Sequence, residues 1–217
     1  MTGRPIRVVI ADDHVMYRRA LRLVLGLDGD IVVVGEAGDG YTAVDVVASA
    51  RPDVVVMDLR MPRLGGVEAI RALGAQVPDA RIVLVTMSDA REDIVAAVEA
   101  GALGCVTKDV PGDRLAEAIR AVRRGEVYFS PAVAACLLHP AVNESSGVDA
   151  DLLELDEREE LVLQRLARGE RTAQIASGMG IAESTIRHLL VTINDRIRAA
   201  ARGAGQAGHG GPSPASP

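Results

Sequence analysis

The sequence predicts an α/β domain with a doubly wound, five-stranded parallel sheet, followed by a small all-α domain. Residues 1–125 alternate short runs rich in Val and Ile with longer helical patterns. These runs are almost entirely apolar, as expected for parallel strands that are buried on both faces. Beyond residue 151 the strand-like runs stop and only helical patterns remain. The two halves of the chain therefore differ in architecture.

The elements of the first domain follow from these runs. We expect strands at residues 6–10, 31–34, 54–57, 82–86 and 104–107, and helices at residues 15–27, 42–50, 66–75, 92–100 and 113–124. Five β-α units in strict alternation predict a doubly wound sheet with right-handed crossovers. Residues 1–125 are accordingly assigned to this domain.

The remaining residues divide into a linker, a helical domain and a tail. Residues 126–151 are expected to be a linker with a short helix at 132–138, because Ser130 and Pro131 favour a helix start. In residues 152–202, Asp156 and Glu159 form a capping box, and Thr172 can cap a second helix. A turn at 179–181 and a helix at 183–198 complete a helix-turn-helix layout. Residues 203–217 are rich in Gly, Ala, Pro and Ser, and we expect disorder there.

Composition excludes several classes of protein. The chain has 217 residues, a net charge of −6 and two cysteines, so neither an overall basic surface nor a disulfide framework is present. The four aromatic residues argue against carbohydrate platforms and single-strand stacking sites. No apolar run approaches the ~18 residues of a membrane span, and the N-terminus has no signal-peptide pattern. We expect a cytoplasmic protein without a membrane partner, on which any DNA-binding surface is local.

Five side chains are predicted to share one cleft. Asp12 and Asp13 follow the first strand, Asp58 follows the third, Thr86 closes the fourth, and Lys108, the only lysine, follows the fifth. Ligands of parallel sheets bind beyond the carboxyl ends of the strands. Clustered carboxylates repel one another unless a cation lies among them, and Mg²⁺ suits such oxygen ligands. A carboxylate beside Mg²⁺ can attack phosphorus, while the lysine and threonine can bind phosphoryl oxygens.

Residues 5–125 resemble the receiver domain of response regulators, which has a flavodoxin-like fold. The matching residues are Asp12-Asp13, Asp58 with Met61-Pro62 and Gly66, Thr86, and Lys108. The resemblance implies that Asp58 is the phosphoacceptor and that a histidine kinase phosphohistidine is the donor. It implies that Asp13 binds Mg²⁺ directly, with Asp12 assisting and the Arg60 backbone carbonyl completing the site.

The resemblance also assigns the residues that respond to the phosphoryl group. Thr86 and Lys108 are implied to sense it, and catalysis is limited to self-phosphoryl transfer and autodephosphorylation. Receivers usually carry Tyr or Phe three residues before the lysine, where this chain has Cys105. Because a thiol is smaller, switching through an aromatic rotamer is in question, and the apolar context favours an inert, buried Cys105. His14 follows the acidic pair and is conceivable as a metal ligand, but it is expected at a helix start, facing solvent.

Residues 155–198 resemble the LuxR-type helix-turn-helix of NarL/FixJ regulators. The matching residues are Asp156-Glu-Arg-Glu159, Val162-Leu163, Leu166-Ala-Arg-Gly169, Thr172, Ile175-Ala176, Met179-Gly-Ile181, Glu183-Ser-Thr185-Ile186-Arg187 and Ile193. Candidate base-reading residues in the long helix are Thr185, Arg187, His188, Val191 and Thr192. Candidate phosphate contacts are Arg171, Arg196 and Arg198. The family usually adds a fourth, dimerising helix, whereas residues 199–202 here lead into the Gly/Pro tail.

The sequence thus predicts a two-component response regulator of the NarL/FixJ type. Phosphorylation of Asp58 is expected to control binding to double-stranded promoter DNA, through release of the helix-turn-helix or through homodimerisation. A receiver-based protein-interaction module stays open, because the basic face is thin: residues 171–202 carry five Arg and two acids. A phosphohydrolase would need a carboxylate where Arg60 stands. Control by a small ligand, without phosphorylation, also stays open because of Cys105.

Overall fold

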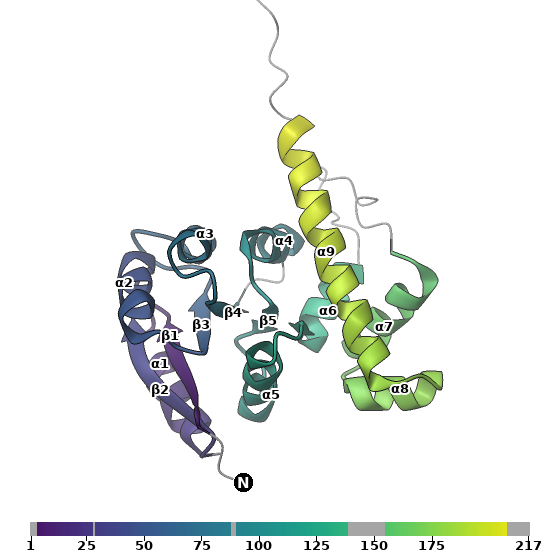
Figure 1. Ribbon diagram of the computed structural model, residues 1–217, viewed down its shortest axis with the longest axis horizontal. Helices are drawn as coiled ribbons and strands as arrows, with labels where there is room; N and C mark the ends of the chain where they lie inside the picture. The colour runs from purple at the N-terminus through teal and green to yellow at the C-terminus, as the bar shows by residue number, and fades with distance from the viewer. Residues whose placement is uncertain (1–3, 28, 88–89, 139–154, 208–217) are drawn as a thin grey trace, which may run out of the picture.

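The N-terminal part of the chain forms one parallel sheet with helices on both faces (Figure 1). The computed structural model describes residues 4–27, 29–87, 90–138 and 155–207. Its strands are β1 (Ile6–Ala11), β2 (Ile31–Ala37), β3 (Val54–Asp58), β4 (Arg81–Thr86), β5 (Gly104–Thr107) and β6 (Tyr128–Phe129), in the order β2-β1-β3-β4-β5-β6. The sheet helices are α1 (Val15–Gly26), α2 (Gly40–Ala50), α3 (Gly66–Gln76), α4 (Arg91–Ala100) and α5 (Gly112–Arg123). The doubly wound parallel sheet is confirmed.

The prediction of five strands is wrong, because the expected linker contributes a sixth. Backbone N–H groups of Tyr128 and Ser130 donate to the carbonyls of Leu103 and Cys105, at 3.0 Å each, and attach β6 to the edge of β5. Phe129 is buried against this edge. Two residues are too few to show a strand periodicity, so only the neighbouring strand reveals their conformation. The first domain therefore extends beyond residue 125.

Each face of the sheet is covered by its own apolar cluster. Leu25 of α1 and Ile119 of α5 pack on one face, against Ile10 and Val56 among others. On the other face, helices α2, α3 and α4 bury side chains such as Ile70. Alternate side chains of a strand point to opposite faces, so the Val- and Ile-rich strands supply both clusters.

The C-terminal helices extend one of these two clusters. They are α6 (Pro131–Leu138), α7 (Glu157–Ala167), α8 (Thr172–Met179) and α9 (Glu183–Ala207). Buried residues of all four, among them Leu137, Leu163, Ile175 and Ile193, belong to the cluster that contains the α3 and α4 side chains. Helix α9 lies alongside α4, and α7 packs on α6 (Figure 1). The helical domain is thus docked on the receiver-like domain.

Helix α9 is longer than expected and reaches five residues into the predicted tail. The sequence analysis ended this helix at residue 198 and began the disordered tail at residue 203, whereas the helix ends at Ala207. Alanine, which is frequent in this stretch, has the highest intrinsic helix propensity and here outweighs two glycines. No separate fourth helix follows among the described residues. The rest of the predicted tail, and the flexible linker expected before residue 152, lie outside the described residues.

Candidate functional site

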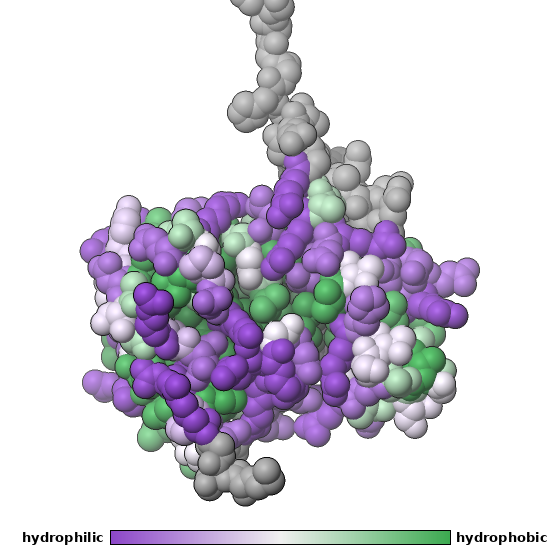
Figure 2. Space-filling model, in the orientation of Figure 1, coloured by the Kyte–Doolittle hydropathy of each residue, from purple (hydrophilic) through white to green (hydrophobic). Residues whose placement is uncertain are grey.

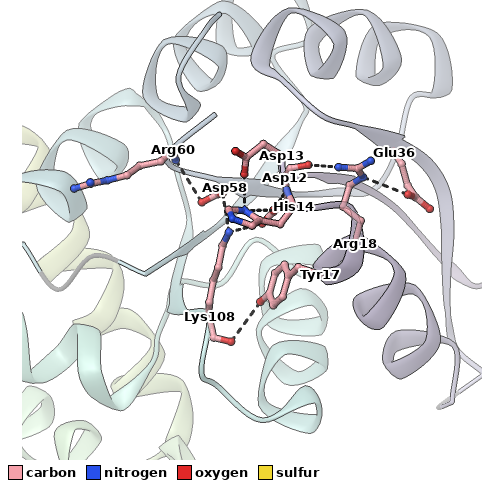
Figure 3. A network of polar contacts seen from close by, with 9 residues as sticks. All are labelled: Asp12, Asp13, His14, Tyr17, Arg18, Glu36, Asp58, Arg60 and Lys108. Carbon is pink, nitrogen blue, oxygen red and sulfur yellow. Dashed lines mark hydrogen bonds and ion pairs between the residues drawn. The ribbon is translucent and has the colours of Figure 1, made fainter. Parts of the chain in front are cut away.

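The five predicted pocket residues lie together at the carboxyl edge of the sheet. Asp12 and Asp13 follow β1, Asp58 ends β3, Thr86 ends β4, and Lys108 follows β5 directly. Figure 3 shows Asp12, Asp13, His14, Asp58 and Lys108 converging on one point. Because β1, β3, β4 and β5 are sheet neighbours in parallel register, their ends meet at one edge. The predicted convergence of Asp12, Asp13, Asp58 and Lys108 is thus observed, while their functional roles stay predictions.

Lys108 bridges two of the buried carboxylates. Its Nζ lies 2.7 Å from Asp58 Oδ2 and 2.6 Å from Asp12 Oδ2, and 5.0 Å from the centroid of the Tyr17 ring. The side chains of Lys108, Asp12 and Asp58 are 8%, 2% and 5% exposed. Burial raises the pKa of Asp58, and the hydrogen bond from Lys108 opposes that rise. Burial lowers the pKa of Lys108, but its bonds to Asp12 and Asp58 raise it above the ordinary value overall.

The carboxylate cluster fits a hard divalent cation. Asp12, Asp13, His14 and Asp58 each offer one ligand atom, and these atoms lie within 4.8 Å of one another. Asp12 Oδ2 is buried and pairs with Lys108. Three carboxylates beside a single lysine leave a net negative charge, which a further cation stabilises. The Arg60 backbone N–H donates to Asp58 Oδ1 at 3.3 Å, which positions the Arg60 peptide beside the cluster.

His14 lies at the start of α1 and is mostly exposed, as the sequence analysis expected, but its ring also contacts the aspartates. Its backbone N–H donates to Asp12 Oδ1 at 2.8 Å, and its ring folds over the carboxylates, with Nδ1 2.6 Å from Asp13 Oδ1 and 3.4 Å from Asp12 Oδ1. The ring remains 70% exposed on its outer side. A helix start leaves the side chain of the preceding residue without a fixed direction, so the sequence could not reveal this orientation.

Thr86 and Cys105 are both buried on neighbouring strands. The carbonyl of Thr86 accepts the backbone N–H of Lys108 at 2.8 Å, which ties the ends of β4 and β5 together. Burial raises the pKa of the Cys105 thiol to about 12, so this cysteine is not a reactive thiolate at neutral pH. Phe129 of β6 pairs in register with Cys105. An aromatic residue therefore lies next to Cys105, but it comes from β6. The sequence analysis did not predict this strand.

The C-terminal helices have the arrangement expected for a helix-turn-helix. Asp156 and Glu159 form the predicted capping box of α7. Gly180 adopts a left-handed conformation, with φ of 67°, in the turn between α8 and α9. The N-cap of α8 is Arg171 and not Thr172, whose hydroxyl instead donates to Glu183 Oε1 at 2.8 Å. That bond fixes the start of α9 relative to α8.

The seven predicted DNA contacts fall into two groups. Thr185 and His188 are exposed on α9, and Thr192 lies one turn beyond His188, to whose carbonyl its hydroxyl donates. Val191 packs partly against the core. The arginines are engaged within this molecule: Arg196 pairs with the buried Glu159 at 3.1 Å, while Arg171 and Arg187 face the receiver-like domain.

Polar contacts connect the helix-turn-helix to α5 and to the segment before β6. Arg171 lies 3.6 Å from Glu117 and 3.8 Å from Asp113, and Arg187 lies 3.5 Å from Glu126. Arg114 donates to the Gly169 carbonyl at 3.1 Å. Figure 2 shows hydrophilic residues gathered over this part of the surface. A pocket between the two domains is lined by residues of both, so the contact is not closely packed throughout.

Helix α9 also contacts the opposite side of the receiver-like domain. Arg198, which the sequence analysis considered as a phosphate contact, donates from Nε to the carbonyl of Val98 in α4 at 3.0 Å.

Among the described residues, no helix combines the length and apolar character needed to cross a membrane.

Comparisons with known proteins agree with this architecture. The response regulator receiver domain matches residues 8–120, and the luxR family of bacterial regulatory proteins matches residues 154–202. The nitrate/nitrite response regulator protein NarP of Escherichia coli is 41% identical over 202 residues, which cover 91% of this chain and 93% of that protein. The DNA-binding transcriptional activator DevR/DosR of Mycobacterium tuberculosis is 37% identical over 183 residues, 84% of each chain.

Two solved structures extend the comparison. The response regulator ChrA of a heme-sensing two-component system is 33% identical, covers 93% of this chain and 98% of that chain, and superimposes with a TM-score of 0.56. A LuxR-family response regulator from Aurantimonas is 36% identical, with a TM-score of 0.58, over 60% of this chain and 94% of that chain. With a receiver domain, a LuxR-type DNA-binding domain and relatives that match both, this chain belongs to the NarL family of two-component response regulators.

Proposed function

We propose that Asp58 accepts a phosphoryl group from a histidine kinase and that this modification controls the binding of promoter DNA. The observation that carries the proposal is the position of Asp58, whose Oδ1 faces the Arg60 N–H while Oδ2 faces Lys108, within a cluster of three aspartates. A side chain held at both oxygens is oriented for attack, and the adjacent ammonium can balance charge on a bound phosphoryl group.

In the proposed reaction, an Asp58 oxygen attacks the phosphorus of the kinase phosphohistidine. The new P–O bond forms as the P–N bond breaks, and the imidazole leaves with its electron pair and takes up a proton. Asp13, Asp12, Asp58 and the Arg60 carbonyl would hold Mg²⁺, which neutralises charge on the transferred oxygens. Lys108 and the Thr86 hydroxyl then bind the oxygens of the aspartyl phosphate. The only substrate of this chemistry, including later hydrolysis, is the protein's own Asp58.

The surface beside the pocket suits a helical kinase domain. Met16 and Met87 are 73% and 77% exposed, and with His14 and Tyr17 they line a groove that leads to Lys108. Exposed apolar side chains continue along α1 at Leu23 and Leu27. Residues 16, 20, 23 and 27 follow the spacing of one helix face, onto which another helix can pack. A partner bound there would lie beside Lys108, which contacts Asp58.

The proposed output is release of the helix-turn-helix, followed by homodimerisation on two DNA half-sites. In the docked state Arg171 and Arg187 pair with Glu117 and Glu126, which compete with DNA phosphates for these side chains. A phosphoryl group adds about −1.5 to −2 charges to the pocket and shifts the balance between docked and released states. The cytoplasm, where promoter DNA resides, is the compartment that we infer.

The decisive experiment measures molecular mass and DNA affinity with and without Mg²⁺ and beryllofluoride, for the wild type and Asp58→Asn. We expect beryllofluoride to produce a dimer with tighter DNA binding in the wild type only. Equal DNA binding in every state would point to constitutive or ligand-controlled regulation. If no state binds DNA, the protein-interaction module becomes the better interpretation, which the internally paired arginines also favour.

A further inference from the structure

The imidazole of His14 is placed as an additional ligand of the pocket cation. We propose that His14 coordinates this cation through Nδ1 and makes the site favour transition-metal divalent ions, among which Mn²⁺ serves as the probe, over Mg²⁺. The inference rests on the proposed phosphoacceptor site and names a ligand that the sequence analysis had placed in solvent. Figure 3 shows the ring beside the side chains of Asp12, Asp13 and Asp58.

The geometry of the donor atoms supports shared coordination. Neighbouring ligand atoms in an octahedral shell with metal–ligand distances of ~2.1 Å lie about 3 Å apart. His14 Nδ1 is 2.6 Å from Asp13 Oδ1 and 3.4 Å from Asp12 Oδ1, which brackets that separation. One ligand atom of Asp58 lies within 4.8 Å of the same group. The nitrogen therefore sits where a ligand beside Asp13 would be.

The local backbone directs the ring toward the cluster. His14 occupies the N-cap position of α1 in an extended conformation, but its side chain forms no hydrogen bond with the helix. Its backbone N–H is instead held by Asp12 Oδ1 at 2.8 Å. Because Asp12 is 1% exposed, that bond is anchored in the core and restricts the position of the adjacent ring. The imidazole does not cap the helix, so its orientation follows from the contact with Asp13 and not from helix formation.

The chemistry of nitrogen sets the expected preference. Mg²⁺ takes oxygen ligands and retains its waters, whereas imidazole suits the later divalent ions of the first transition row. A site made of carboxylates alone distinguishes these ions weakly. Replacing one coordinated water by an imidazole strengthens binding of Mn²⁺ and leaves binding of Mg²⁺ almost unchanged. His14 would thus determine which ion accompanies phosphorylation of Asp58.

The test measures metal binding directly on the full-length protein. Mn²⁺ and Mg²⁺ affinities are determined by titration for the wild type, His14→Asn, and the control His188→Asn, which removes an exposed histidine of α9. Pulsed electron paramagnetic resonance of the Mn²⁺ complex detects coordinated nitrogen through its echo modulation. We expect nitrogen modulation in the wild type and His188→Asn, its loss in His14→Asn, and a Mn²⁺ affinity about tenfold weaker in His14→Asn with little change for Mg²⁺.

Two results would overturn the inference. One is a wild-type Mn²⁺ complex without nitrogen modulation, and the other is a modulation that persists in His14→Asn. A further variant, Asp13→Asn, separates this inference from the proposed function, because it removes a ligand of either ion. If Asp13→Asn leaves both affinities unchanged, the pocket itself is not the cation site and both proposals fail. If it weakens both, while His14→Asn weakens neither, only the role of His14 is rejected.

Discussion

The acidic pocket and the interface between the domains are both built from opposite charges, but they hold these charges in different environments. In the pocket, Lys108 and its two aspartate partners are each less than a tenth exposed. At the interface, the side chains of Arg171 and Glu117 are 53% and 36% exposed. Exposed ion pairs contribute roughly 0–1 kcal/mol, whereas removing one member of a buried pair costs about 3–5 kcal/mol. The pocket is thus suited to a fixed geometry, and the interface to reversible release.

The largest expected effect is that of Lys108→Ala. The substitution leaves Asp12 and Asp58 as buried carboxylates without their cation, and we expect a loss of about 3 kcal/mol in the free energy of unfolding without divalent metal. The matched control is Arg120→Ala, which breaks the exposed pair with Asp30 and should cost under ~1 kcal/mol. Urea denaturation measures both. An equal loss of unfolding free energy in the two variants would show that burial does not make the Lys108 ion pairs stronger than the exposed pair.

The second largest expected effect on the free energy of unfolding is that of Cys105→Phe, in the apolar layer between the pocket and the domain interface. Cys105→Phe introduces a ring beside Phe129, its partner in register, where both side chains are already buried. We expect overpacking to cost about 2 kcal/mol in the free energy of unfolding. The exchange Cys105→Phe with Phe129→Cys conserves total volume and should recover most of that loss. A double variant no more stable than Cys105→Phe would contradict the proposed contact.

A smaller effect is expected when the interface loses its acids. Glu117→Gln with Glu126→Gln removes the charges that face Arg171 and Arg187, so release of the helix-turn-helix becomes easier. At ~0.5 kcal/mol for each exposed pair, or ~1 kcal/mol for both, DNA affinity without beryllofluoride should rise about fivefold. Fluorescence anisotropy with labelled DNA measures this change, and Glu68→Gln on α3 with Asp45→Asn on α2, two exposed acids, is the charge-matched control. An equal rise in the control would indicate a general charge effect.

The smallest effect is a pH shift at Tyr128, which lies between the two domains. Burial, followed by the negative charge of Glu117, raises the pKa of Tyr128 to about 12. An exposed tyrosine ionises near ~10, so Tyr128 stabilises the folded state below that pH, and its contribution is lost as the pH rises from ~10 to about 12.

The measurement uses Tyr17→Phe with Tyr41→Phe, which leaves Tyr128 as the only tyrosine. Its tyrosinate absorbance should appear near pH 12 in the native protein and near ~10 in denaturant. Ionisation near ~10 in the native protein would show that the interface is already open in solution.

The sequence by itself determined the parallel sheet and the residues of the pocket. Apolar runs that alternate with helical patterns indicate a doubly wound parallel sheet. Because the carboxyl ends of neighbouring parallel strands lie at the same edge, Asp58 and Lys108 could be placed together from the sequence. The helix-turn-helix followed in the same way from local signals, such as the capping box at Asp156 and the turn at Gly180. All of these features depend on short-range periodicity and on the geometry of regular elements.

Only the tertiary structure decided how the domains meet. Strand β6 forms because β5 offers an unpaired edge. The direction of the His14 ring depends on the neighbouring aspartates, and the position of Asp12 is set by its burial in the core. Arg171 and Arg187 looked like DNA contacts because Glu117 and Glu126 lie dozens of residues away, although Arg187 also pairs with Glu183 one helical turn before it. Such contacts depend on which surfaces face each other after folding, and exposed charges at this spacing carry no periodic signal that marks their partners in advance.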